Sequence, residues 1–235
     1  MEKMPIDNYN ADQLRGFISV ARRRLAEITA DTPKLAANID GQESAKRAIQ
    51  IAAYVDPDDT KALPFDIVFF GPSGAGADKL VILAAQFGVA AYAVKCCPCG
   101  KRTDPKRACT CTPGEVRRHW AKVLARPEVL GAAIHCEVRP VTFRQMGQKH
   151  GLPYSDMRSY IDQAGPRPFT LICDLDQSCT SIMRQATNEL GFPAETVRVV
   201  LSIADSIAAL DNAPAVKVHH IAEAIQYRRL DRPFD

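Results

Sequence analysis

The sequence predicts an α/β fold in which a reduced core with a small parallel sheet is followed by an all-α C-terminal region. Residues 66–71, DIVFFG, form a short apolar run that ends in glycine, as a buried strand does. The glycine-rich stretch GPSGAGAD and the amphipathic segment DKLVILAAQF follow, which gives the order strand, loop and helix. After residue 142 the apolar residues recur only at helical spacing.

The composition is typical of a globular protein, because 46% of the 235 residues are hydrophobic and 24% are charged. No apolar run reaches the about 18 residues that a membrane span needs. The first ten residues, MEKMPIDNYN, contain acids and no apolar core, so we expect no signal peptide and a cytoplasmic location. In that compartment the eight cysteines are expected to stay reduced, as core thiols or as metal ligands.

Two amphipathic helices are predicted before the first strand. Within an N-terminal unit, residues 1–36, the segment 11–30 places apolar side chains at helical spacing with arginines on the other face. This pattern favours a packing helix over a membrane helix. After a break at Pro33, residues 41–55, GQESAKRAIQIAAYV, form the second helix.

Two more strands and a cysteine-rich loop complete the predicted α/β domain, residues 37–140. VAAYAVKC at 89–96 and AIHCEVRPV at 133–141 have the composition of buried strands. Between them lie the cysteine loop, residues 96–111, and the helix PGEVRRHWAKVLA, whose first turn suits Pro113.

Residues 141–235 are predicted to form a C-terminal helical domain. Its helical segments are TFRQMGQKH, YSDMRSYIDQA, SCTSIMRQATNELG, AETVRVVLSIADSIAAL and KVHHIAEAIQYRRL. Glycines or prolines separate these segments, as helix caps and turns require.

The stretch GPSGAGADKL, residues 71–80, has the glycines of a phosphate-binding loop without its chemistry. A working loop reads G-x-x-x-x-G-K-[ST], in which the lysine neutralises phosphate oxygens and the hydroxyl binds Mg²⁺. Gly71, Gly74 and Gly76 still permit the turn. Ala77 and Asp78, however, occupy the lysine and hydroxyl positions.

These substitutions predict that the chain binds ATP weakly or not at all. Asp78 at the start of the helix repels the phosphate that the helix dipole would otherwise attract. Lys79 lies about 200° further around the helix than the lysine position, so we do not expect it to substitute. Phosphoryl transfer depends on charge neutralisation by lysine, metal and arginine, and we therefore expect no ATP hydrolysis by this chain alone.

Five cysteines crowd into residues 96–111, and zinc is the favoured interpretation. Two close pairs, nine residues apart, can place four thiolates around a tetrahedral Zn²⁺: Cys97, Cys99, Cys109 and Cys111. The gap within each pair is tighter than the common spacing of about two to four residues, whereas Cys96 and Cys99 form a C-x-x-C. His119 is a spare candidate ligand. The alternative is a set of reduced thiols, for which an exposed basic loop offers no core.

Other cysteines and histidines give weaker signals. Cys136 and Cys173 lie in apolar runs, which indicates core positions, and Cys179 is uninformative. His219 and His220 fall in a helical stretch, where we expect surface or core residues rather than metal ligands.

Positive charge concentrates between residues 95 and 126, where nine basic residues stand against two acids in a chain whose net charge is only +3. The candidate nucleic-acid-binding residues are Lys101, Arg102, Lys106, Arg107, Arg117, Arg118 and Lys122. Such a cluster can neutralise several phosphates, in a manner that depends steeply on salt. The alternative, that these side chains only solubilise a surface helix, is equally consistent with the sequence.

Three segments together resemble one known family. They are GQESAKRAIQIAA followed by a strand and GPSGAG, then CCPCG with CTCTPGEVRRH, and LSIADSIAAL with HHIAEAIQYRRLDR. These are similar to the magnesium-chelatase-like AAA+ ATPases of the competence protein ComM type. The resemblance covers about residues 38–232 with one large gap. It implies a reduced P-loop AAA+-like core, assembly into a hexameric ring and, for the best-known members, DNA translocation or branch migration.

Carried over residue by residue, the resemblance implies a family member without motor chemistry. The family's sensor asparagine falls on Lys95 and its second sensor arginine on Glu195. Its arginine finger falls on Gly131 and the neighbouring aspartate on Leu130. No hydrophobic run ending in Asp-Glu exists between residues 76 and 95. These losses predict a pseudo-ATPase rather than an enzyme.

The gap in the resemblance also predicts the sheet. Family members carry two further strands between the phosphate loop and the sensor strand. If the family strand order 5-1-4-3-2 is kept, the deletion leaves strand 66–71 between strands 133–141 and 89–96. Strand 89–96 then becomes an exposed edge, and the N-terminal helix is the candidate cover.

Three functions stay open at this point. The favoured one is a catalytically inactive binding or regulatory module that acts on DNA or on an active AAA+ ring, beside an AAA+ homologue or in a self-oligomer. The second is a residual nucleotide-binding ATPase subunit whose reaction is completed in trans, which the missing arginine finger disfavours. The third is a purely structural interaction scaffold.

Overall fold

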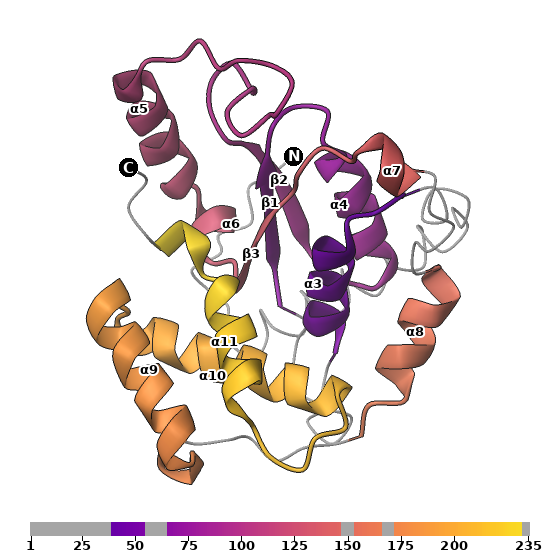
Figure 1. Ribbon diagram of the computed structural model, residues 1–235, viewed down its shortest axis with the longest axis vertical. Helices are drawn as coiled ribbons and strands as arrows, with labels where there is room; N and C mark the ends of the chain where they lie inside the picture. Colours follow the sequence, from indigo (N-terminus) through magenta and orange to yellow (C-terminus); the bar gives the residue numbers. More distant parts are fainter. Residues whose placement is uncertain (1–38, 55–64, 147–152, 166–171, 232–235) are drawn as a thin grey trace, which may run out of the picture.

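A three-stranded parallel sheet forms the centre of the molecule (Figure 1). The computed structural model describes residues 39–54, 65–146, 153–165 and 172–231. The strands are β1 (Ile67–Gly71), β2 (Ala91–Lys95) and β3 (Ile134–Glu137), in the order β2-β1-β3. This order confirms the prediction that strand 66–71 lies between the other two. The helix predicted at residues 11–30 lies outside the described residues.

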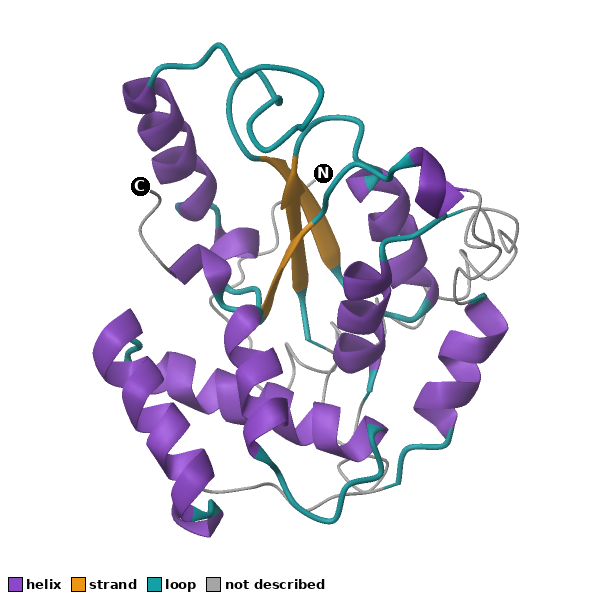
Figure 2. Cartoon of the chain, in the orientation of Figure 1, coloured by secondary structure: helices purple, strands orange, loops and turns teal. Residues whose placement is uncertain are grey.

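Helices cover both faces of the sheet and extend below it (Figure 2). The α-helices are α3 (Glu43–Ala53), α4 (Ala77–Gln86), α5 (Pro113–Leu124), α6 (Pro127–Leu130), α7 (Phe143–Met146), α8 (Tyr154–Asp162), α9 (Gln177–Leu190), α10 (Ala194–Leu210) and α11 (Val218–Gln226). Two 3₁₀ turns, η2 (Ile172–Asp174) and η3 (Arg229–Asp231), complete the described elements. The helices predicted within the described residues are present, and the short α6 is an addition that the sequence pattern did not indicate.

The central strand β1 is buried on both faces because its side chains alternate between them. Ile67 and Phe69 join the apolar cluster beneath α3 and α4. Val68 and Phe70 join a second cluster beneath α5, where the Phe70 ring meets the Trp120 ring edge to face with their centroids 6.0 Å apart. The sheet is thereby covered by helices on both sides.

One apolar cluster runs across residue 140, the expected domain boundary. It contains Ile49 of α3 and Leu83 of α4 together with Ile203 and Ile207 of α10, all essentially inaccessible to solvent. α3 packs on α4, α8 and α10 at once. The α/β part and the C-terminal helices therefore share a core. The division of the chain into two domains at residue 140 stays a prediction.

Polar contacts from Arg47 tie the same helices together. The Arg47 guanidinium lies 2.9 Å from Asp211 and 3.3 Å from Glu223, and it donates to the Tyr160 hydroxyl at 3.1 Å. The Tyr160 hydroxyl in turn donates to Asp211 at 2.9 Å. A single side chain on α3 thus links α8 to the C-cap of α10 and to α11.

The segment YRRLD, residues 227–231, closes the outer edge of the sheet at β3. The His135 amide donates to the Tyr227 carbonyl at 2.7 Å, and the Leu230 amide donates to His135 Nδ1 at 3.3 Å. Arg228 donates to the carbonyl oxygens of Ala132 and Ala133, both at 2.8 Å. The stretch, which is part of the family resemblance, therefore has a structural role, because it meets the His135 amide and ring and the two carbonyls just before β3.

Burial and charge keep the His135 ring of this contact neutral. Desolvation and the nearby Arg228 cation lower the pKa of His135 to about 3, so the ring stays neutral and Nδ1 is able to accept the Leu230 amide. Arg228 is 7% exposed and also pairs with Asp231, with N–O distances of 2.7 and 2.9 Å. The guanidinium is thus fully engaged at the junction of β3 and η3.

We predict that Arg228→Ala lowers the free energy of unfolding by about 2–4 kcal/mol, because two carbonyls and a carboxylate lose a charged donor in a buried setting. Urea denaturation followed by circular dichroism measures the change. Arg198→Ala is the matched control, since its pair with Glu195 is exposed and should contribute no more than about 0.5 kcal/mol. Equal stability of the two variants would contradict a stabilising role for the Arg228 contacts at β3.

Candidate metal centre and basic surface

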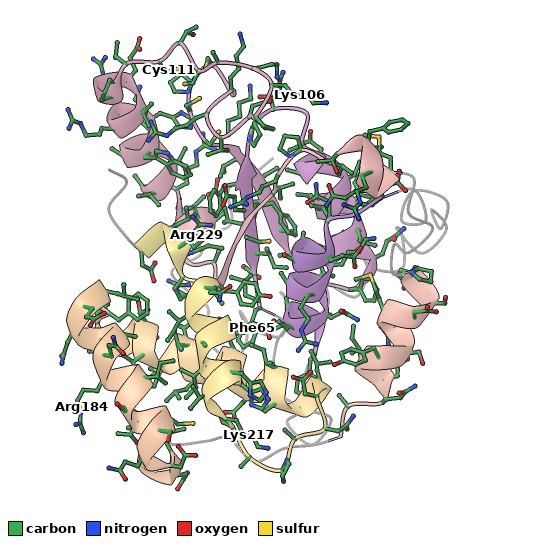
Figure 3. The ribbon with its side chains drawn as sticks, in the orientation of Figure 1. Phe65, Lys106, Cys111, Arg184, Lys217 and Arg229 are labelled. Atoms are coloured by element: carbon green, nitrogen blue, oxygen red, sulfur yellow. The ribbon has the colours of Figure 1, made fainter. Side chains whose placement is uncertain are left out.

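Four cysteine sulfurs converge where the loop after β2 folds back toward α5 (Figure 3). This cysteine cluster consists of Cys97, Cys99, Cys109 and Cys111, and its four sulfur atoms all lie within 4.8 Å of one another. Cys97 Sγ lies 3.4 Å from Cys99 Sγ and 3.7 Å from Cys109 Sγ. Cys99 Sγ lies 3.6 Å from Cys109 Sγ. The structure therefore brings together all four predicted ligands.

The sulfur spacing matches a tetrahedral metal site. A metal–sulfur bond of about 2.3 Å places the corners of a regular tetrahedron about 3.8 Å apart. The three measured separations, 3.4, 3.6 and 3.7 Å, lie just inside this value. Thiolate ligands in a closed set of four form structural sites, which hold a loop in place, rather than catalytic sites, which keep a position open. The cluster can therefore hold a metal ion.

Backbone amides around the cluster donate hydrogen bonds to its sulfurs. Arg102 N–H donates to Cys97 Sγ at 3.3 Å, and Cys99 N–H donates to Cys111 Sγ at 3.4 Å. A hydrogen bond from the Thr110 backbone lowers the pKa of Cys99 to about 5. The Cys99 amide also lowers the pKa of Cys111, but desolvation and the neighbouring thiols outweigh it and raise that pKa to about 12. The four thiols compete for ionisation, and a bound cation removes the competition.

The two spare candidate ligands lie outside the cysteine cluster. Cys96 Sγ donates to the Arg102 carbonyl at 2.6 Å, and desolvation raises the pKa of Cys96 to about 11, so it stays a protonated thiol. His119 Nε2 lies 2.8 Å from the Lys95 carbonyl oxygen. The four ligands predicted from sequence spacing therefore agree with the geometry, and neither Cys96 nor His119 belongs to the cluster.

Local sequence holds the second half of the loop against α5. Thr112 is the N-cap of α5 and exchanges side-chain and backbone hydrogen bonds with Glu115, which forms a capping box. Val116, Trp120 and Val123 recur on one side of the helix and are buried. Cys111 is therefore fixed one residue before the N-cap of a helix whose N-terminal dipole favours a thiolate.

The glycine loop after β1 keeps its turn for steric reasons. A Cβ on Gly71 would lie 2.2 Å from the Val138 carbonyl oxygen. Gly74 and Gly76 have φ values of 87° and 95°, in the left-handed region that favours glycine. Asp78 is exposed at the start of α4. The three glycines are thus explained by chain geometry, independently of any nucleotide.

The cysteine loop docks on this glycine loop. Ser73 N–H donates to the Gly100 carbonyl at 2.7 Å, and the Arg107 guanidinium donates to the Ser73 carbonyl. Asp104 orients Arg107 through a contact of 2.6 Å. Gly100 is required there, since its φ is 67° and a Cβ would lie 2.1 Å from Ser73 Oγ. One side of the glycine loop is therefore occupied by the chain itself.

The predicted basic residues gather on the cysteine loop and on α5, beyond the end of the sheet. The exposed members are Lys106, Arg107, Arg117, Arg118 and Lys122, whereas Lys101 and Arg102 are half-buried. Lys106 and Cys111 lie at the same end of the molecule in Figure 3. Arg118 and Lys122 stand one helical turn apart on the side of α5 opposite its buried residues. We call this set the basic surface.

The positions to which the resemblance assigns motor residues lie at three different elements. Lys95 is exposed at the end of β2. Leu130, 76% exposed, is the last residue of α6, and Gly131 is its C-cap. Glu195 is exposed in the first turn of α10, where it pairs with Arg198 at 3.3 Å.

A hollow of about 1120 Å³ lies between α3, α7, α11 and the end of β3. Its arginines are engaged by neighbouring acids: Arg47 by Asp211 and Glu223, and Arg229 and Arg139 by Glu137. The charges lining this hollow are thus used to hold α3, β3 and α11 together.

A second group of potential ligands was not indicated by the sequence pattern. Asp211, His219 and His220 bring three ligand atoms within 4.8 Å of one another. Asp211 already pairs with Arg47 and Tyr160, and His220 Nδ1 accepts the Lys217 amide at 3.0 Å. His220 is buried and His219 exposed, which confirms the expected core and surface positions. Only the turn between α10 and α11 brings them together, so no local spacing signalled the group.

Fold and site together define an α/β protein with a helical C-terminal part and a cysteine loop that could hold a metal ion. Residues 155–228, from α8 to α11, match the family described as magnesium chelatase, subunit ChlI C-terminal. The match supports a relationship to the magnesium-chelatase-like AAA+ proteins, and it does not extend to the cysteine loop. No curated protein matches the chain. Among the described residues no helix is long and apolar enough to span a membrane.

We predict that Cys109→Ser weakens binding of a divalent metal more than about 100-fold, because only three of the four thiolate ligands remain. The loss should exceed that caused by removing a residue that merely hydrogen-bonds to a ligand. Elemental analysis of freshly reduced protein and the thiolate charge-transfer absorption of added Co²⁺ measure the effect. Cys96→Ser is the control and should keep its metal. Equal metal content in both variants would be inconsistent with the proposed ligand set.

Proposed function

We propose that this chain is a catalytically inactive, AAA+-related module in which a zinc-stabilised loop presents a basic surface to nucleic acid. In the same proposal it is a shortened relative of the ComM-type ATPases. The observation that carries it is the joining of the cysteine cluster and the basic surface in one short segment. The metal site fixes the loop and the start of α5, and both display their cations to solvent.

The donor set favours zinc over other metals. Four thiolates are soft ligands, and a tetrahedral arrangement of sulfur selects Zn²⁺ or an iron–sulfur unit rather than Mg²⁺ or Ca²⁺. The sulfur separations of 3.4–3.7 Å suit a single ion. Zinc, when bound, would supply the charge that stabilises the thiolates. Cys97, Cys99, Cys109 and Cys111 would hold it.

Loss of ATPase chemistry is the second part of the proposal. Ala77 and Asp78 place a methyl group and a negative charge where phosphate neutralisation and Mg²⁺ binding need a lysine and a hydroxyl. The backbone of Ser73 is engaged by Gly100 and Arg107. Any nucleotide binding through Gly74 and Gly76 would therefore be weak.

The basic surface fits a polyanion through charge alone. Its exposed cations lie on a loop and along one helix, without aromatic side chains placed among them for base stacking. Such a surface contacts phosphates and gives affinity that falls steeply with salt, with little sequence preference. DNA is the nucleic acid that the family relationship suggests.

An AAA+ ring is the other partner that the C-terminal match favours. The helices α8 to α11 are retained while the nucleotide site is degraded, as expected for a subunit or regulator that binds such a ring. The missing arginine finger argues against completion of hydrolysis in trans. Association with an acidic protein surface would show salt dependence without a preference for nucleic acid.

We predict that the double substitution Arg118→Gln with Lys122→Gln weakens duplex DNA binding roughly tenfold. It should also reduce the slope of log K against log salt by about 1.8, since each lost phosphate contact removes about 0.9. Fluorescence anisotropy of a labelled duplex at two salt concentrations measures both effects. Arg184→Gln, on the exposed side of α9 away from the basic surface, is the control and should bind unchanged (Figure 3). Binding that is absent or insensitive to salt would refute this surface.

We also predict no Mg²⁺-dependent ATP binding by the full chain in isothermal titration at millimolar nucleotide. The variant Ala77→Lys with Asp78→Thr restores the two missing groups and should gain affinity without gaining hydrolysis, because the acidic metal motif is still absent. Tight, Mg²⁺-dependent binding by the unmodified chain would overturn the pseudo-ATPase proposal.

A further inference from the structure

The strand β2 forms an edge of the three-stranded sheet (Figure 1). Ile67 N–H donates to the Ala90 carbonyl, and Cys96 N–H donates to the Gly71 carbonyl. In a parallel ladder alternate residues face the same neighbour, so Ala91, Ala93 and Lys95 turn their amides and carbonyls away from β1.

Lys95 differs from the two alanines, because its carbonyl oxygen accepts a hydrogen bond from His119 Nε2 at 2.8 Å. For Ala91 and Ala93 no partner outside the ladder is found in the part of the chain that the structure describes. Two amides and two carbonyls therefore remain available along the edge. Such a row of groups is a template for another strand.

A hollow of about 440 Å³ adjoins this edge. Asp78 and Val81 of α4 line it on one side, and Arg126, Glu128 and Val129 line it on the other side, at α6. Ala91, Tyr92, Ala93 and Val94 form its floor. The small side chains of the two alanines leave room for a backbone to approach β2.

We propose that a second copy of this chain adds its own β2 to this edge in antiparallel orientation. Ala91 of each copy faces Ala93 of the other, and the two sheets join into one of six strands. This register forms four hydrogen bonds and leaves Lys95 to His119. A register shifted by two residues would instead require the Lys95 carbonyl, which His119 already engages.

Symmetry and charge favour a second copy over an unrelated strand. A two-fold axis at Tyr92 makes the contact self-complementary. The outward amides and carbonyls of Ala91 and Ala93 in one copy then pair with the same groups in the other copy. Because the axis is perpendicular to the sheet, α6 of one copy faces α6 of the other. The α6 side of the hollow carries both signs, Arg126 and Glu128, so like copies can pair opposite charges across the axis.

This inference is independent of the proposed function. The edge lies along β2 between α4 and α6, whereas the basic surface lies on the cysteine loop and α5. Failure of DNA binding would leave the dimer unaffected, and a monomeric chain could still bind DNA.

The test is sedimentation velocity of the reduced, zinc-loaded full chain over a range of concentrations, with a concentration-dependent dimer as the expected result. Ala93→Pro removes one edge amide and should raise the dissociation constant of the dimer at least tenfold. Proline is tolerated at an edge position whose amide faces outward, so the monomer should keep its circular dichroism spectrum. Ala93→Thr, which keeps the amide, is the control and should remain dimeric.

A second measurement does not depend on the proline variant folding. Tyr92 lies at the axis in a non-hydrogen-bonded pair, where Cα atoms stand about 4.5 Å apart, a separation that permits a disulfide. Tyr92→Cys should therefore form a disulfide between two copies through position 92, identified by peptide mass spectrometry. A monomer at every concentration, including one whose edge is covered by residues 1–38 or by another protein, overturns the proposal. So does a dimer that gives no disulfide at position 92.

Discussion

The spacing of the four cysteine sulfurs is the constraint on which one end of the molecule depends. The sulfurs of Cys97, Cys99 and Cys109 lie 3.4–3.7 Å apart and that of Cys111 lies within 4.8 Å of them. Thiolates this close repel one another, and a cation among them would remove the repulsion. The loop that carries them holds Ser73 through Gly100 and passes through Thr112 into α5. The position of the glycine loop and the display of the basic surface therefore follow from one cluster.

The two edges of the sheet are treated differently, and the difference has a physical cause. At β3 the outward His135 amide donates to the Tyr227 carbonyl, the His135 ring accepts the Leu230 amide, and Arg228 donates to the carbonyls just before the strand; all three partners follow the C-terminal helices. At β2 the corresponding groups of Ala91 and Ala93 meet no partner among the described residues. A short sheet is stable with one closed edge when both faces are packed, and its open edge then becomes the place for association.

Local pattern predicted the strands and helices, and the order of the strands came from the family resemblance. The cysteine cluster was also predictable, since Cys97/Cys99 and Cys109/Cys111 are close pairs whose spacing carries the chemistry. The contacts of Arg47 with Glu223 and of Arg228 with Ala132 were not, because they join residues 176 and 96 positions apart. No periodicity encodes such pairs. They depend on where the C-terminal helices turn, which packing decides.

The glycine loop shows that the fold alone can require the glycines of a nucleotide-binding motif. Gly71 leaves room for the Val138 carbonyl, and Gly74 and Gly76 adopt positive φ angles, so a side chain at any of the three would be strained. None of these demands involves a phosphate. Selection on the fold alone would keep the glycines while allowing alanine and aspartate at positions 77 and 78. The presence of glycines is therefore weak evidence for nucleotide binding. The residues at the lysine and hydroxyl positions of the motif, here Ala77 and Asp78, are the better evidence.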